Sequence, residues 1–205
     1  MAPPCTDFLL DDPLYSRHIW KNAGTTIEIQ TQRPQRELPD SEIQRRKWVT
    51  LVRDPIDHFL SGLTECLSRD ARRRAGTKTM DERVSVWVRR VKRLRGKSRC
   101  GKCETHSFPQ ANFLLTREGD VFSQMEFVGH IKELSGLLEM IGIPFNASLP
   151  RGKDHVEIKE QFSRNITLLS NNTLRAICEL VAIDYFLFDF EPPDACRDLP
   201  SLQFQ

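Results

Sequence analysis

The sequence lacks any hydrophobic run long enough to cross a membrane, and it lacks the apolar core of a signal peptide. The segment that comes nearest, residues 4–14, is short and contains three aspartates. Internal repeats and domain linkers are missing as well. With 205 residues, the chain is long enough for one domain with its own core. We therefore expect a single domain over residues 1–205, with a core at 13–190 and an irregular, proline-containing tail at 191–205.

A second ligand pair for a structural metal site is also missing. Cys100 and Cys103 have the Cys-x2-Cys spacing of a zinc site and His106 follows, but no second pair comes after them. We therefore expect no bound metal. The six cysteines are an even number, which suits disulfides in a secretory compartment. Three N-glycosylation sequons, which begin at residues 146, 165 and 171, favour the same compartment.

The most informative stretch is WVTLVRDPIDHFLSG, residues 48–62. It begins as an apolar run with the β-branched and aromatic bias of a buried strand. Pro55 ends the strand and suits the first turn of a helix, with Asp54 as N-cap. Arg53 is then expected at the carboxyl end of a strand, where open α/β sheets bind ligands, and Ser61 about two helical turns later could face the same site. An arginine and a hydroxyl form a natural phosphate clamp, although an Arg-Asp pair that only fixes the turn gives the same pattern.

A second stretch, HIWKNAGTTIEI at residues 18–29, has the composition of an anion-binding loop. Gly24 permits a close backbone approach to an anion, and the N–H groups from about Ala23 to Thr26 are expected to point at it. Lys21 adds a mobile positive charge, and the two threonines add hydroxyl donors. The order differs from that of a Walker A loop, because Lys21 precedes the glycine.

The lysine-first loop and the strand-Arg-Asp-Pro-x5-Ser element together resemble the sulfotransferase superfamily, which uses PAPS (3′-phosphoadenosine 5′-phosphosulfate) as sulfuryl donor. Three further segments resemble Golgi carbohydrate sulfotransferases, in the order of that family. They are His-x-x-Pro-Gln within residues 105–115, a strand-then-helix segment at 126–144, and Asp-Tyr-x-x-Phe at 184–190. The resemblance therefore spans residues 18–190.

The fold that the resemblance implies is α/β, with a small, mostly parallel central sheet flanked by helices, as in the P-loop-like sulfotransferase fold. The alternation of strand and helix patterns predicts the same parallel crossovers. We expect the strand at 48–52 to be central and a strand near 125–128 to lie beside it.

The resemblance also assigns the cofactor site. It puts the 5′-phosphosulfate of PAPS at the lysine loop and the 3′-phosphate at the Arg-Asp-Pro element. The residues expected to bind the cofactor are Lys21, Asn22, Ala23, Gly24, Thr25, Thr26, Arg53 and Ser61. Sulfuryl transfer gathers negative charge on the leaving 5′-phosphate oxygen, as phosphoryl transfer does. Lys21 and the loop N–H groups are therefore expected to stabilise that oxygen.

An acceptor hydroxyl also needs a base. His106 is the first candidate, because imidazole titrates near neutrality and its His-x-x-Pro-Gln context matches the family. Glu28 and His58 are alternatives. His58 lies where relatives often have arginine, so shaping the 3′-phosphate site is a second interpretation of that residue. A structural His106 that caps a helix at 107–115 fits the sequence equally well.

Two features depart from the family pattern. The segment between Thr26 and Trp48 has only about twenty residues, and the acceptor-side acid or base of relatives often comes from there. A sulfotransferase-like protein without activity is therefore an alternative. Relatives usually carry an N-terminal membrane anchor, which this chain lacks. A soluble relative, a catalytic fragment and a gene model incomplete on its N-terminal side stay open. With an anchor on the full-length protein, the expected location is the Golgi lumen or the secretory pathway.

Residues 69–102 are strongly basic. They hold 14 Lys and Arg against 3 acidic residues, a local charge of +11 in a chain of net charge +2. Within them an apolar stripe at helical spacing predicts an amphipathic helix: Val84, Trp87, Val88, Val91 and Leu94. The basic residues fit either a solvated helix face or a surface for a polyanionic glycan. No nucleic acid is expected, because the one aromatic, Trp87, belongs to the stripe. A basic glycan- or nucleic-acid-binding module is nevertheless the third candidate function.

Overall fold

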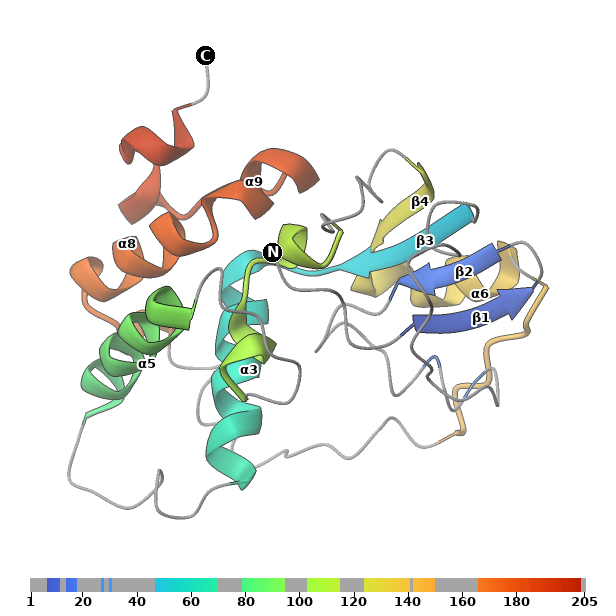
Figure 1. The fold of residues 1–205 in the computed structure, drawn as a ribbon, viewed down its shortest axis with the longest axis horizontal. Helices are drawn as coiled ribbons and strands as arrows, with labels where there is room; N and C mark the ends of the chain where they lie inside the picture. Colours follow the sequence, from blue (N-terminus) through green and yellow to red (C-terminus); the bar gives the residue numbers. More distant parts are fainter. Residues whose placement is uncertain are drawn as a thin grey trace. The chain divides into compact units, whose positions relative to one another are not determined.

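The computed structural model describes residues 7–11, 14–17, 27, 30, 47–69, 79–94, 103–114, 124–140, 142–149 and 166–203. Helices and a sheet with parallel strands give a mixed α/β fold, as expected (Figure 1). The Cα atoms cluster into two compact units. The sheet unit comprises Met1–Arg53 and Asn112–Asp154, and the helical unit comprises Asp54–Ala111 and His155–Gln205.

The sheet has four strands in the order β1-β2-β3-β4. The strands are β1 (Asp7–Asp11), β2 (Leu14–Arg17), β3 (Lys47–Val52) and β4 (Met125–His130). β1 and β2 pair antiparallel, whereas β3 runs parallel to both of its neighbours, β2 and β4. The prediction that the strand at 48–52 is central, with the strand near 125–128 beside it, is confirmed. The sequence analysis did not predict β1.

β3 forms the centre of the sheet unit because it is buried along almost its whole length. Every residue from Trp48 to Val52 is buried, and only Lys47 is exposed. Val49 and Leu51 on one face of the strand cluster with Ile27 and with Leu137 of helix α6 (Leu134–Met140). Burial of an aliphatic side chain contributes about 1.5–3 kcal/mol. A near-continuous apolar run is what a parallel strand covered on both faces requires.

Helix α6 is shorter than the apolar stripe of the sequence indicates. The stripe runs from Ile131 to Ile141, but residues 131–133 form a 3-10 turn, η4, before the α-helix begins. The helix ends at Met140 because Gly142 adopts a positive φ of 75°, which glycine reaches without strain. The Gly142 and Ile143 N–H groups then bond to the last carbonyls of the helix, those of Glu139 and Leu138.

The helical unit contains α3 (Pro55–Arg69), α5 (Met80–Leu94), α8 (Asn171–Leu180) and α9 (Ala182–Phe188). Asp54 caps α3 as predicted, because its Oδ1 accepts hydrogen bonds from the N–H groups of Ile56 and Asp57, both at 2.9 Å. The apolar residues at helical spacing in α3, α5 and α8 are buried, except Leu94 at the end of α5, which is half-buried. These amphipathic faces form the core of the unit.

α5 and α8 are joined by polar contacts at their margins. The Ser85 and Thr173 hydroxyls lie 2.8 Å apart, and Lys92 bonds Glu179 at 3.3 Å. Ser170, one of two residues that the sequence offers as a cap here (the other is Asn172), is the N-cap of α8, and its hydroxyl accepts from Thr173 N–H. Asp81 of α5 accepts from both the N–H and the hydroxyl of Ser170, at 2.8 and 3.0 Å.

Two disulfides cross-link the helical unit. Cys66 of α3 is bonded to Cys103, and Cys178 of α8 is bonded to Cys196. The second disulfide and an ion pair from Arg175 to Asp198 attach the tail to α8. Residues 191–203, where an irregular tail is expected, contain the 3-10 turns η6 (Asp194–Cys196) and η7 (Pro200–Leu202). None of the described helices has the length and hydropathy needed to cross a membrane.

Asp81 makes the stability of the α5–α8 contact dependent on pH. Burial acts to raise its pKa, but the hydrogen bonds from Ser170 and Thr173 outweigh this effect, and the pKa lies below its ordinary value. The contribution of the carboxylate is therefore present above the unfolded pKa of about 4 and is lost as the pH falls through the folded pKa.

We expect Asp81→Asn to lower the free energy of unfolding by about 0.5–1 kcal/mol at pH 7, since the site is exposed and screened. The difference from the parent should shrink below about pH 4, as measured by urea unfolding across pH. Glu139→Gln is the control, because this exposed carboxylate has no hydrogen bond or ion pair with any described residue. A pH-independent effect of Asp81→Asn would contradict the prediction.

Candidate functional site

The carboxyl ends of three parallel strands lie at the same edge of the sheet. β2, β3 and β4 run in one direction, and Val52 at the end of β3 pairs with His130 at the end of β4. Arg53, which is half-buried, follows Val52 directly. The chain that leaves β2 after Arg17 leads, four residues later, to Lys21. Ligands of open α/β sheets bind at this kind of edge.

The sequence analysis missed two polar residues at the same edge. His130 is the last residue of β4 and is exposed, and its N–H donates to Glu133 Oε2 at 2.6 Å. Glu133 belongs to η4, the turn that follows the strand. A signal was present, since both residues come within five positions of the end of the strand expected near 125–128. The parallel pairing thus adds an imidazole and a carboxylate to the edge that holds Arg53.

The predicted site residues fall into three groups. Lys21, Asn22, Ala23, Gly24, Thr25, Thr26 and Glu28 lie outside the described residues. Arg53 lies at the sheet edge, as predicted from the strand-Arg-Asp-Pro pattern. Ser61 is half-buried on α3 and His106 is half-buried in the 3-10 turn η1 (Cys103–Ser107), both in the helical unit.

His106 does not cap a helix at 107–115. The segment forms two 3-10 turns, η1 and η2 (Gln110–Phe113), separated by Phe108 and Pro109. Proline has no N–H to donate, and it disfavours the helical conformation of the residue before it. Pro109 therefore explains the interruption, and His106 sits at the end of the first turn.

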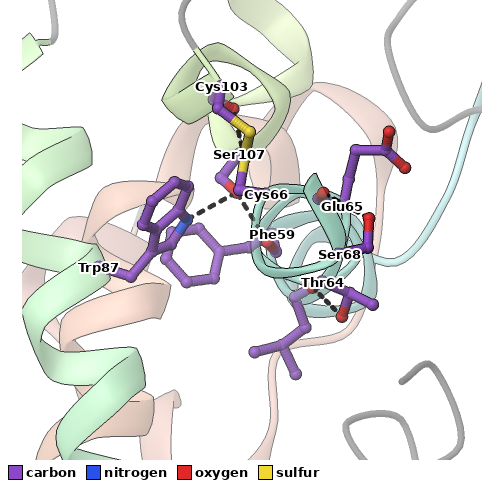
Figure 2. Close-up of a disulfide and its surroundings, with 9 residues drawn as sticks. Phe59, Thr64, Glu65, Cys66, Ser68, Trp87, Cys103 and Ser107 are labelled. Atoms are coloured by element: carbon purple, nitrogen blue, oxygen red, sulfur yellow. Dashed lines mark hydrogen bonds between the residues drawn. A yellow bond between two sulfur atoms is a disulfide. The ribbon is translucent and has the colours of Figure 1, made fainter. Parts of the chain in front are cut away.

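The segment that carries His106 is fastened to α3 by its neighbours (Figure 2). Ser107 is fully buried, its hydroxyl donates to the Phe59 carbonyl at 2.9 Å, and it accepts from Trp87 Nε1 at 2.9 Å. About two turns further along α3, the Cys66–Cys103 disulfide joins the start of η1 to the helix. Trp87, assigned to packing from the sequence, thus also holds the hydroxyl next to His106.

His58 makes a further link between α3 and this segment. Its ring is fully buried, and Nε2 lies 3.1 Å from the Phe108 carbonyl, to which a protonated Nε2 donates. A buried imidazole that is hydrogen-bonded to the backbone fixes the position of a loop. This role is structural, and it differs from the roles of base and phosphate-site residue that the sequence left open.

The two segments that carry the C-terminal part of the family resemblance contact each other. Asp184 of α9 is fully buried, and its two carboxylate oxygens accept from the N–H groups of Gln110 and Ala111, at 2.7 and 2.8 Å. These are the first N–H groups of η2, which are orphaned without such a partner. The His-x-x-Pro-Gln segment is therefore held at one end by a disulfide and at the other by a buried carboxylate.

Tyr185, the neighbour of Asp184, is buried and remains a neutral phenol. Burial raises the pKa of its hydroxyl far above the usual value, and the negative charges of Asp54, Asp184 and Asp57 raise it further. The hydroxyl has no hydrogen-bond partner among the described residues. It stays a proton donor at every physiological pH.

The metal alternative for Cys100, Cys103 and His106 is excluded by the disulfide. Cys103 is bonded to Cys66, so its sulfur is not a thiolate ligand. Elsewhere in the described part of the chain, no group of three or more His, Cys, Asp or Glu side chains is arranged to hold a metal ion.

Comparison of the chain with protein-family models, with curated proteins and with solved structures gives no match.

The contact between α3 and the His106 segment predicts opposite effects for two helical glycines. A Cβ at Gly62 would collide with the Ser107 hydroxyl and the His106 carbonyl, whereas a Cβ at Gly136 of α6 would meet nothing. We expect Gly62→Ala to destabilise the protein by about 1–3 kcal/mol through overpacking. Gly136→Ala should stabilise it by up to about 1 kcal/mol through helix propensity. Urea unfolding measures both, and equal effects of the two substitutions would contradict the packing.

The Asp184 carboxylate predicts a second effect on stability. Asp184→Asn keeps one acceptor oxygen and turns an amide N–H toward a backbone donor, so one buried N–H group loses its partner. We expect a loss of about 1–3 kcal/mol in the free energy of unfolding. Asp189→Asn is the matched control, because Asp189 is exposed and has a φ of 54°, a conformation that asparagine tolerates. The two variants should differ clearly in thermal and urea unfolding.

Proposed function

We propose that this chain is a PAPS-dependent sulfotransferase that moves a sulfuryl group to a hydroxyl of a carbohydrate, on a P-loop-like sulfotransferase fold. The observation that carries the proposal is the parallel pairing of β2, β3 and β4. It brings the chain that leads to Lys21 and the residue Arg53 to one sheet edge. A donor with two separated phosphate groups needs two anion sites within its own length.

The two anion sites have different chemistry. Arg53 offers a planar fork of N–H donors, which suits bidentate recognition of the 3′-phosphate. The N–H groups from Ala23 to Thr26 and the ammonium group of Lys21 suit the 5′-phosphosulfate, where several donors surround a phosphate. Ser61 adds a hydroxyl donor for the 3′-phosphate. The bridging oxygen that leaves with the 5′-phosphate gains negative charge during transfer, and Lys21 stabilises it.

His106 is the proposed base for the acceptor hydroxyl. The segment that carries His106 is held rigidly, because the Cys66–Cys103 disulfide and hydrogen bonds of Ser107 and Asp184 fasten it. A rigid support is what a catalytic group needs, since misplacement by about 1 Å can cost a hundredfold in rate. Glu28 stays the alternative base.

The exposed face of α5 supports a carbohydrate acceptor that is itself anionic. Arg89, Arg90, Lys92 and Arg93 are exposed on it, whereas Trp87 faces the core. Lys92 is partly neutralised by Glu179. A sulfated or uronate-bearing glycan fits such a face by charge. The same face favours a second candidate, a glycan-binding protein of this fold without transferase activity.

The two disulfides support a secretory location. Disulfides persist in oxidising compartments and are rare in the cytosol, and both pairs have the Cα separations of ordinary disulfides, 5.6 and 6.3 Å. We propose the Golgi lumen or the secretory pathway, with any membrane attachment through a segment outside this chain.

Nucleotide binding tests the proposed function directly. The product nucleotide, 3′-phosphoadenosine 5′-phosphate, should raise the melting temperature by several degrees at a hundredfold excess over its Kd, since such binding adds about 2.7 kcal/mol. Adenosine 5′-phosphate lacks the 3′-phosphate and should therefore raise the melting temperature much less. Absence of any shift with the first nucleotide would overturn the proposal. A shift without labelled-sulfate transfer to any of a glycan panel would favour the second candidate.

Kinetics should separate Lys21 from Arg53. Arg53→Ala removes a contact to a phosphate that takes no part in the chemistry, so KM for PAPS should rise about ten- to a hundredfold with little change in kcat. Lys21→Ala removes a charge beside the leaving oxygen, so kcat should fall on the order of a hundredfold or more. Lys21→Arg should rescue only partly. Steady-state kinetics at saturating acceptor measure kcat and the KM for PAPS of each variant. If Lys21→Ala changed only KM, Lys21 would bind PAPS without stabilising the leaving oxygen.

A further inference from the structure

The loop after α6 presents one of the three N-glycosylation sequons at the surface. Asn146 is exposed, and it is followed by Ala147 and Ser148 in a turn. Asn146 Oδ1 accepts from both the N–H and the hydroxyl of Ser148, at 3.0 and 2.6 Å. The hydroxyl that the sequon requires is therefore hydrogen-bonded to the amide of its own asparagine.

The backbone of Asn146 is fixed without the use of its side-chain nitrogen. The Asn146 carbonyl accepts from Gln30 Nε2 at 2.8 Å, and the Asn146 N–H donates to Gln30 Oε1 at 3.0 Å. Asn146 Nδ2 itself donates no hydrogen bond to any described residue. The loop thus holds the sequon in place through its backbone, and the asparagine that carries the acceptor nitrogen is exposed.

The sequon at Asn171 is built differently. Asn171 is the first residue of α8, and the hydroxyl of its sequon belongs to Thr173, which is only 4% exposed. Thr173 Oγ1 is 2.8 Å from the Ser85 hydroxyl and 3.1 Å from the Ser170 hydroxyl. This hydroxyl is committed to the α5–α8 contact and to the helix cap. The sequon at 165 lies outside the described residues.

We propose that Asn146 is a site of N-linked glycosylation. Its Nδ2 forms a bond to the anomeric carbon of an oligosaccharide carried on a lipid diphosphate. The bond from that carbon to the diphosphate oxygen breaks, the lipid diphosphate leaves, and Nδ2 loses one proton. The host's membrane supplies the lipid-linked donor, and its oligosaccharide transferase catalyses the step in the oxidising compartment where disulfides form. The proposal does not depend on sulfotransferase activity.

The test uses the full chain secreted from eukaryotic cells behind a cleavable signal sequence. Peptide N-glycosidase in ¹⁸O water converts a glycosylated asparagine into labelled aspartate, which peptide mass spectrometry locates. We expect label at residue 146 in both secreted and cell-retained protein. Asn146→Gln, Ser148→Ala and Ala147→Pro should each remove this glycan, whereas Ser148→Thr should retain it.

Asn171→Gln is the control, since it deletes a different sequon and should leave the label at residue 146 unchanged. Cooperative thermal unfolding and non-reducing electrophoresis of each variant show that it is folded with its disulfides. Unlabelled Asn146 in wild-type protein that has entered the secretory pathway would overturn the proposal, whatever the state of the other two sequons. Entry is established by removal of the signal sequence.

Discussion

The passage of the chain from β3 into α3 is the constraint on which most of the described structure depends. It takes two residues, Arg53 and Asp54, and the Asp54 carboxylate satisfies two N–H groups at the start of α3. β2 and β4 pair with the strand before this junction. The Cys103–Ala111 segment is fastened to the helix after it. A weakened cap would loosen the start of the helix that supports His106.

The sequence predicted this junction well, because its signals are local. An apolar run followed by Arg53, Asp54 and Pro55 predicted strand, cap and helix within a few residues, and all three are present. The apolar stripe of α5 was equally clear, because a buried face repeats at helical spacing along one helix. The position of Arg53 at the sheet edge followed from the same local pattern.

The sequence could not predict the contacts between distant residues. Asp184 accepts a hydrogen bond from the N–H of Gln110, 74 positions earlier in the sequence, and neither motif indicates that the other is its partner. Six cysteines allow fifteen pairings, so the two observed disulfides could not be chosen from spacing. The antiparallel strand β1 was not predicted, because its few apolar residues are flanked by aspartates. The helix that one interpretation of His106 places at 107–115 is interrupted, because Pro109 cannot donate a backbone hydrogen bond and restrains Phe108 before it.

The Cys66–Cys103 disulfide has a consequence for the integrity of the chain. The two cysteines are 37 positions apart, and the interval between them contains all of the basic residues of the 69–102 stretch. Basic sequences are the preferred targets of trypsin-like proteases. A single cut anywhere between residues 67 and 102 would leave the two fragments joined by the disulfide. The cleaved protein would stay one covalently linked molecule until a reductant separated its two fragments, so the disulfide that fastens η1 to α3 also limits the effect of a cut within the basic stretch.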